Sequence, residues 1–185
     1  MLLAKTSVKD SPIAGQGLFL EQAAGKGSLI GIYTHDLTIL SEEEYTSRVL
    51  AGDELVLRTG CRWVDDLFIY NETGVEDEDY INHADNPTLL YHCGLLIARQ
   101  DLPPGEELTV DYKYILAEWE PGFVCSRSGK NIRGLPGRKA MLESARELLA
   151  LFEAEEPEKA VTGQNHQSWR VIVTAAKERP RNRGQ

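Results

Sequence analysis

Two polar residues, Asn82 and His83, directly follow the apolar Ile81 near the middle of the sequence. An amide beside an imidazole is costly to bury unless both groups find hydrogen-bond partners, so the pair suggests a binding or catalytic site. The Asp-Asn-Pro sequence at residues 85–87 is typical of a turn. A turn alone gives no reason for the residue types at 82 and 83.

Two further segments carry residue types that ligand sites use. The Gly-Gln-Gly-Leu-Phe sequence at 15–19 has glycines that let a backbone approach a ligand closely, although a tight turn without a ligand is the simpler interpretation. It is not the dinucleotide-binding fingerprint, because the GxGxxG spacing and a following helix are missing. The segment 104–112 reads Pro-Gly-Glu-Glu-Leu-Thr-Val-Asp-Tyr; its Tyr112, taken singly, is more often a core aromatic with a satisfied hydroxyl.

The elements that must position these residues are predicted to be short strands, separated by turns rich in glycine and proline. A helix is expected to begin at Ser41, whose hydroxyl can cap the first turn while Glu44 reaches back in a capping box. Gly52 is the expected end of this helix. An acidic loop at 76–79 separates two of the β segments, and 101–105 is a predicted turn. The predicted strands cover residues 18–20, 29–33, 62–70, 89–99 and 107–112.

From Arg138 onward the apolar residues recur at helical spacing, which predicts an amphipathic helix from about residue 138 to 153, ending before Pro157. Its apolar face is expected to form core packing or a lid rather than a partner site. For residues 169–176 the periodicity does not distinguish strand from helix, and 179–183 is expected to be a disordered tail. The predicted apolar face consists of Met141, Leu142, Ala145, Leu148, Leu149 and Phe152.

The composition of the 185 residues, 42% hydrophobic and 26% charged, is ordinary for one globular domain with a modest appendage. No apolar run approaches the roughly 18–20 residues of a membrane span, and residues 1–5 are too short a stretch for a secretory signal, so a cytoplasmic protein without a membrane partner is expected. The three cysteines, Cys61, Cys93 and Cys125, form no CxxC pair. They fit a reducing compartment and are expected to be small buried residues.

Charge is unevenly distributed along the chain. Residues 1–122 carry 8 Lys/Arg and 22 Asp/Glu, a net charge of −14, whereas residues 123–185 carry 12 and 7, a net charge of +5. The acidic main part argues against direct binding of nucleic acid. It favours a basic protein partner through long-range attraction, or it serves only to keep the protein soluble, and the two interpretations have equal weight.

In this order and spacing, the three segments resemble the signature motifs of the SET-domain family of protein-lysine methyltransferases. Residues 15–19 match the family's Gly-x-Gly before Leu-Phe, and residues 105–112 match its Gly-Glu-Glu-Leu-Thr-x-Asp-Tyr nearly in full. Tyr-Ile-Asn-His-Ala at 80–84 resembles the family's Phe-Ile-Asn-His-Ser, and Gly-Ile-Tyr at 31–33 resembles its strand with an active-site tyrosine. The likeness covers roughly residues 8–122.

The resemblance implies a mainly β protein with the β-clip or SET fold, in which small curved sheets surround a C-terminal stretch threaded through a loop as a pseudoknot, plus the C-terminal α-helix. That threading would bring Asn82 beside Tyr112. The implied organisation is a SET domain at 1–122, a degenerate post-SET segment with the C-terminal helix at 123–156, and a C-terminal extension at 157–185.

The resemblance also implies transfer of a methyl group from S-adenosyl-L-methionine to the ε-amine of a lysine in a protein substrate, for example in a basic tail. Tyr112 and Tyr33 would be the catalytic residues, and both would line a substrate channel together with Val110. A lysine ammonium has a pKa of about 10.4 in solution, and a narrow apolar channel beside a sulfonium cation would favour the neutral amine. Positioning would supply most of the catalysis, without a metal. The residues implied to bind the cofactor are Gly15, Gln16, Gly17, Leu18, Asn82, His83, Tyr112 and Phe123.

Several positions depart from the family pattern. Val110 stands where the family usually has Phe or Tyr, and because valine lacks a phenol, di- or trimethylation is the expected product. Asp79, Ala84 and Thr88 replace the usual Arg, Ser and Asn. These substitutions leave open an alternative, a non-catalytic SET-like module that binds a peptide or the cofactor. A hydrolase built on His83 lacks a convincing nucleophile.

Residues 123–134 resemble a post-SET segment that has lost its zinc ligands. In relatives this region supplies three cysteines, and a fourth comes from beside the Asn-His motif; here only Cys125 remains. The other three ligand positions are occupied by Arg127, Ile132 and Asp85. One thiolate and one carboxylate cannot form the closed four-ligand site that structural zinc requires, so no metal is expected. Phe123 and the helix after Arg138 are expected instead to pack over the cofactor and complete the channel.

Overall fold

The computed structural model describes residues 1–33, 37–120 and 123–153, and Met1–Glu153 form one compact unit. The predictions for 169–176, for the tail at 179–183 and for the extension at 157–185 therefore fall outside the described residues. Within the described part of the chain, no helix is both long enough and apolar enough to cross a membrane.

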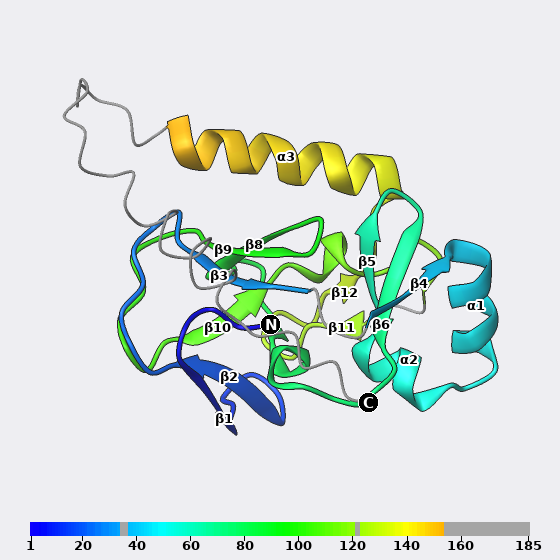
Figure 1. Cartoon of the computed structure of the whole chain (residues 1–185), viewed down its shortest axis with the longest axis horizontal. Helices are drawn as coiled ribbons and strands as arrows, with labels where there is room; N and C mark the ends of the chain where they lie inside the picture. Colours follow the sequence, from blue (N-terminus) through cyan, green and yellow to red (C-terminus); the bar gives the residue numbers. More distant parts are fainter. Residues whose placement is uncertain (34–36, 121–122, 154–185) are drawn as a thin grey trace, which may run out of the picture. The chain divides into compact units, whose positions relative to one another are not determined.

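The strands of the described chain form four small β-sheets, and a long helix follows them (Figure 1). The mainly β fold class with a C-terminal helix is thus confirmed. The first sheet contains β1 Thr6–Asp10, β2 Gln16–Leu20, β10 Glu107–Val110 and β7 Asn82–His83, in that order. The second contains β3 Leu29–Ile32, β9 Leu95–Ala98 and β8 Leu89–His92; the third contains β4 Leu37–Ser41, β6 Leu67–Asn71 and β5 Cys61–Val64; the fourth contains β11 Phe123–Val124 and β12 Asn131–Ile132.

Strand β10 joins the three segments that the sequence singled out. It pairs antiparallel with β2, where Leu108 lies opposite Leu18, and parallel with β7, where Thr109 lies opposite Asn82 and Val110 opposite His83. A parallel pair cannot be closed by a tight hairpin, so the chain must leave β7, build other elements and return. That return brings Asn82 and the residues after Val110 together, as the resemblance implied.

The segments predicted as single strands at 62–70 and 89–99 are each a hairpin, β5–β6 and β8–β9. In the second hairpin the turn residues Cys93 and Gly94 both have positive φ, 49° and 84°, the backbone required by a two-residue type I′ turn. Asp65 in the first hairpin also has a positive φ of 51°. Because the turn residues are not the usual Asn-Gly, these turns could not be predicted from residue type.

The predicted helix at Ser41 is confirmed as α1 Glu42–Leu50. Its capping box is present in full, with the Ser41 hydroxyl accepting from the Glu44 backbone and the Glu44 carboxylate accepting from the Ser41 backbone. Gly52, with φ of 75°, follows the C-cap as expected. A second helix, α2 Glu54–Thr59, was not predicted; the Asp53 side chain caps it by accepting the backbone N–H groups of its first turn.

The two largest of three apolar clusters hold most of the unit together. The larger joins the first two sheets and includes fully buried leucines, each contributing about 2 kcal/mol through removal from water. The smaller joins α1 to the third sheet, where Tyr45 stacks on Phe68 with ring centroids 4.0 Å apart. The fully buried leucines of the larger cluster include Leu18, Leu20, Leu89 and Leu108.

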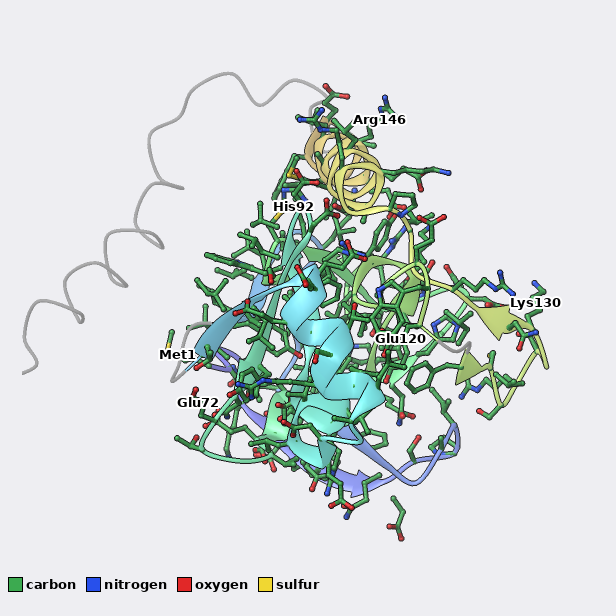
Figure 2. All side chains as sticks on the ribbon, turned by 90° about the vertical axis from the view of Figure 1, so that its right-hand side faces the viewer. Met1, Glu72, His92, Glu120, Lys130 and Arg146 are labelled. Atoms are coloured by element: carbon green, nitrogen blue, oxygen red, sulfur yellow. The ribbon has the colours of Figure 1, made fainter. Side chains whose placement is uncertain are left out.

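The C-terminal helix, α3 Gly137–Glu153, agrees with the predicted range, but the predicted apolar face is wrong in part. Leu142, Leu149 and Phe152 are 48%, 61% and 47% exposed, whereas Ala140 and Ser144 are buried against β8 and β5. Apolar residues surround most of this helix, so periodicity could not fix which side faces the sheet. The side with the small residues faces the sheets, because small side chains allow the helix to approach the strands closely. Figure 2 shows His92 of β8 close beneath the helix.

Candidate active site

Tyr112 lies where β10 ends and a short 3₁₀ helix, η2 Tyr112–Tyr114, begins. Asp111 caps this helix by accepting the N–H of Lys113 at 3.1 Å, which turns the chain sharply after the strand. The backbone N–H of Tyr112 donates to His83 Nδ1 at 3.2 Å, and its hydroxyl donates to the carbonyl of Ile81 at 2.9 Å. Tyr112 is therefore fixed at both ends on the segment around β7.

Tyr33 follows β3 and comes from the opposite side of the site. Its backbone N–H donates to the carbonyl of Gly94 at 2.9 Å, and its hydroxyl donates to the carbonyl of Glu78 at 3.2 Å. Glu78 belongs to the 3₁₀ helix η1 Asp77–Tyr80, which lies directly before β7. The hydroxyls of the two predicted catalytic tyrosines thus donate to carbonyls that are only three residues apart in the chain.

A cavity of about 170 Å³ lies between these tyrosines. It is lined by all of the residues predicted for the substrate channel and also by Phe123. The ring of Phe123 meets that of Tyr112 edge-on, with the ring centroids 5.9 Å apart. Apolar and polar groups share its wall. Its lining includes Tyr33, Cys61, Asp79, Ile81, Tyr91, Leu96, Val110, Tyr112, Glu120 and Phe123.

Burial keeps both phenols protonated. It raises the pKa of Tyr112 to about 12, and it raises the pKa of Tyr33 well above the ordinary value, with the neighbouring acidic groups adding to the effect. A neutral phenol has one proton to donate, and here that proton is engaged by a backbone carbonyl. The remaining lone pairs of each oxygen are then acceptors for a group in the cavity.

Tyr91 was missed by sequence reasoning. Its hydroxyl donates to the carbonyl of Arg62 and lies 3.7 Å from Cys61 Sγ, and its ring meets Tyr33 edge-on at 6.1 Å. Burial raises the pKa of the Cys61 thiol to about 12, so Cys61 acts as a small buried residue rather than a nucleophile. The only signal for Tyr91 in the sequence was a tyrosine within a buried strand, which is common.

Asn82 holds the glycine-containing loop rather than projecting into the cavity. Its amide nitrogen lies 3.0 Å from the carbonyl of Gln16, 3.2 Å from that of Ala14 and 2.9 Å from Glu107 Oε1. Gly17 has no room for a side chain, since a Cβ there would collide with Glu107. Gly15 has a positive φ of 51°. The hydrogen bonds of Asn82 and the conformations of the two glycines therefore act together to fix the backbone of residues 15–17.

One residue of the predicted cofactor set, Leu18, turns its side chain into the core. The side chain of Leu18 is fully buried in the core, so it cannot contact a ligand. Glu107 Oε2 is buried and has no hydrogen-bond partner among the described residues, which is unfavourable unless a cationic group lies nearby. A cofactor that carries an ammonium and a sulfonium would bring a cation to the loop that Asn82 and Glu107 hold, although Glu107 itself does not line the cavity.

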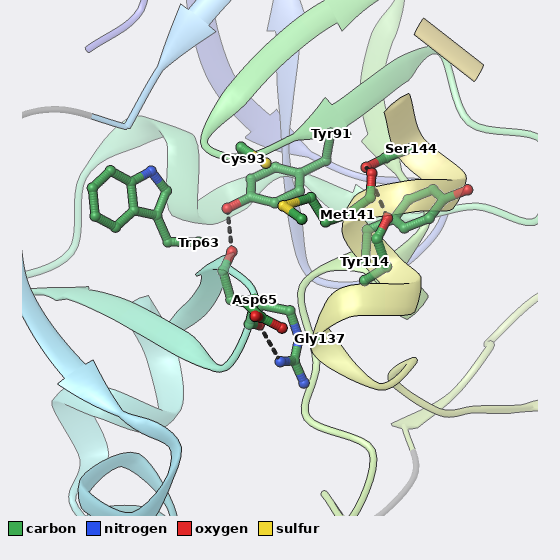
Figure 3. A pocket seen from close by; sticks show the side chains of 10 residues that line it. Trp63, Asp65, Tyr91, Cys93, Tyr114, Gly137, Met141 and Ser144 are labelled. Carbon is green, nitrogen blue, oxygen red and sulfur yellow. Dashed lines mark hydrogen bonds between the residues drawn. The ribbon is translucent and has the colours of Figure 1, made fainter. Parts of the chain in front are cut away.

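The helix α3 does not complete this cavity, contrary to expectation. Its residues line a separate pocket of about 10 Å³ with Tyr91 and Tyr114, room for about one water molecule (Figure 3). Its contacts are instead with β8, β5 and η2. The β11–β12 hairpin, whose turn contains Lys130 (Figure 2), supplies Phe123 instead.

Three potential metal ligands do meet near β7. Atoms of His83, Asp85 and Cys125 lie within 4.8 Å of one another, so the structure adds His83 to the two residues considered from sequence. His83 Nδ1, however, accepts the N–H of Tyr112, which requires the neutral ring to carry its proton on Nε2. That proton points toward Asp85 at 3.4 Å and blocks metal binding. The absence of a metal stays a prediction.

The sequence pattern of the SET domain matches residues 15–113, more than half of the chain. The protein belongs to the SET-domain family, whose members are generally protein-lysine methyltransferases. The matched range includes Tyr33, Asn82, His83 and Tyr112 and ends before Phe123. A comparison with curated proteins gave no match.

Proposed function

We propose that this protein is an S-adenosyl-L-methionine-dependent methyltransferase that modifies the ε-amine of a lysine in another protein. The observation that supports this most directly is the pair of phenols, Tyr33 and Tyr112, whose protons are engaged by backbone carbonyls on the wall of one cavity. A channel lined by such acceptors suits an amine, because a neutral amine has two N–H bonds to donate and one lone pair to react.

Binding of the cofactor is assigned to the backbone of residues 15–17, to the β7 residues Asn82 and His83, and to the rings of Tyr112 and Phe123. When bound, S-adenosyl-L-methionine supplies an electrophilic methyl group. The orphaned carboxylate oxygen of Glu107 supports a cationic ligand at this place. The backbone of the loop is held by Asn82, so most contacts would be made by main-chain atoms and would need little reorganisation.

The chain's own residues would orient the amine. Tyr33 and Tyr112 would accept its two N–H bonds, which leaves the nitrogen lone pair directed away from both phenols and toward the reacting methyl. The buried rings disfavour the ammonium form, so the substrate would lose its proton to water before transfer. Fixed acceptors of this kind act by positioning, which is worth several kcal/mol of the barrier.

Val110 is the basis for the proposed degree of methylation. It is the last residue of β10, is buried in the cavity wall and has no hydroxyl that could bind a water beside the amine. Space that a phenol would fill remains for a methylated amine. The product is therefore proposed to be di- or trimethyl-lysine.

The alternative, a non-catalytic module that binds a peptide or the cofactor, rests on the departures at Asp79, Ala84 and Thr88. Two of these have a local structural explanation. Thr88 Oγ1 accepts the N–H of Thr109 at 2.8 Å while Thr109 Oγ1 accepts the N–H of Thr88 at 3.0 Å, and Ala84 is buried without a polar atom to satisfy. Only Asp79 changes the chemistry of the cavity, and the two tyrosines are retained, so the enzyme is favoured.

One experiment tests the proposal. The purified protein is first titrated with S-adenosyl-L-methionine by calorimetry, and it is then incubated with labelled cofactor and a proteome of unmethylated proteins. Label in lysine side chains, mapped by mass spectrometry, would support the enzyme. Cofactor binding without label would favour the non-catalytic module, and absence of both would reject the proposal.

The partner is proposed to be a protein with an exposed lysine in a basic segment, because the main part of the chain has a net charge of −14. Neither nucleic acid nor a membrane is proposed as a partner. The cytoplasm is proposed as the compartment, and the three free cysteines agree with a reducing environment.

A further inference from the structure

Asp79 occupies a special place in the cavity wall. It lies in η1 between Glu78 and Ile81, the two residues whose carbonyls hold the hydroxyls of Tyr33 and Tyr112. It lines the large cavity and also a separate small pocket of about 10 Å³, and Tyr33 lines both as well. One of the substitutions that distinguish this chain from the family pattern thus lies in the wall of the predicted lysine channel.

The carboxylate of Asp79 has few partners. Its Oδ2 accepts the backbone N–H of Glu76 at 2.8 Å, and no cationic group lies within ion-pair distance of it among residues 1–33, 37–120 and 123–153. Burial raises the pKa of Asp79 to about 6, and the neighbouring acids Glu78 and Glu76 add to the rise, while the exposed Arg58 opposes it weakly. A half-buried carboxylate without a cation is unfavourable, so a cationic ligand would be stabilised here.

The cation is not the lysine that is methylated. A carboxylate beside the reacting amine would favour its ammonium form, which cannot attack a methyl group. The acceptors suited to the neutral amine are the phenols of Tyr33 and Tyr112, whereas Asp79 also lines the smaller pocket, which does not include Tyr112. A second basic side chain of the same substrate satisfies both requirements.

We propose that Asp79 is a specificity-determining residue, whose carboxylate pairs with an arginine or lysine side chain that flanks the methylated lysine. This inference rests on the proposed function and narrows its substrate class to lysines with a basic neighbour. The acidic character of the main part of the chain would bring such segments to the site, and Asp79 would select the position of the neighbour along the peptide.

The test uses peptides with one lysine in an otherwise uncharged sequence, in which a single arginine is moved through the positions on either side. The full-length protein is expected to prefer one arginine position by roughly tenfold or more in kcat/KM over the peptide without arginine. Asp79→Asn is expected to abolish this preference, so that its kcat/KM becomes the same for every arginine position and for the arginine-free peptide. An equal response at every position, or a preference that survives in Asp79→Asn, would overturn the proposal.

Two variants serve as controls. Asp77→Asn removes an exposed acid from the same 3₁₀ helix that does not line the cavity, and it should keep the preference. Asp79→Arg places a cation at the same position, and it should reverse the preference toward a glutamate in place of the arginine. Peptide binding by fluorescence anisotropy gives a readout without turnover, so a charge pair lost in Asp79→Asn would be detected even if the protein transferred no methyl group.

Discussion

The hydroxyls of Tyr33 and Tyr112, which come from segments nearly eighty residues apart in the chain, are held by carbonyls of the short segment from Glu78 to Ile81. That segment is therefore the common support of both phenols. Movement of η1 would displace both oxygens together and keep their spacing. This relationship gives the site its rigidity and leads to several predictions.

Replacing Tyr112 with phenylalanine should lower turnover by about a hundredfold or more, because the channel loses one of its two amine acceptors. Fold and cofactor affinity should persist, since the backbone bond to His83 and the contact of the ring with Phe123 remain. Methyl transfer is measured with labelled cofactor. Tyr114→Phe is the matched control, since its hydroxyl bonds to Glu147 outside the cavity; unchanged turnover in Tyr112→Phe would exclude Tyr112 from the mechanism.

Asn82→Ala should release the loop at 15–17 and weaken cofactor binding roughly tenfold. The carbonyls of Ala14 and Gln16 lose their donor, and the free energy of unfolding should fall by about 1–2 kcal/mol. Calorimetry gives the affinity, and urea denaturation gives the stability. The exposed Asn86→Ala serves as the control, and equal affinities of the two variants would show that the loop does not contact the cofactor.

Val110→Tyr should restrict the product to monomethyl-lysine, because a phenol at this buried position fills the space beside the amine. The wild-type protein should proceed to di- or trimethyl-lysine when the substrate is exhausted. Mass spectrometry of the product separates the three states. Only monomethyl product from the wild-type protein would contradict the role given to Val110.

Asp79→Asn should stabilise the protein at neutral pH. The pKa of Asp79 is about 6 in the folded protein and near 3.8 when the chain is unfolded, so the folded state binds the proton more tightly. The favourable contribution of this tighter proton binding to the free energy of unfolding is complete below about pH 4. It is lost as the pH rises through 6. The difference in unfolding free energy should be small at pH 4 and reach about 1–2 kcal/mol in favour of the variant at pH 8. A variant no more stable at pH 8 would show that Asp79 already has a partner.

Chelation should leave the protein unchanged. If His83 Nε2 carries a proton, the group formed with Asp85 and Cys125 cannot bind zinc, and excess chelator should not shift the melting temperature. Elemental analysis of the purified protein provides an independent measurement. Stoichiometric zinc, or a fall in melting temperature with chelator, would mean that the proton arrangement of His83 is different.

Local features of the fold followed from local sequence. The capping box of Ser41 and Glu44 marked the start of α1, and the residues after Arg138 marked α3 to within about one residue. The two hairpins were recognised as β but not as pairs of strands, because Cys93 and Asp65 adopt positive φ without the residues that usually signal it. Tertiary contacts impose those turns.

The sequence by itself determined the family, the motifs and the two tyrosines, because these depend on residue type and order. Only the tertiary structure decided that Asn82 holds a loop, that Tyr91 joins the cavity, that Leu18 belongs to the core and that α3 turns its small residues inward. Each of these depends on which distant segment lies against a residue. The parallel pairing of β10 with β7 is one such contact, and nothing within either segment alone specifies it.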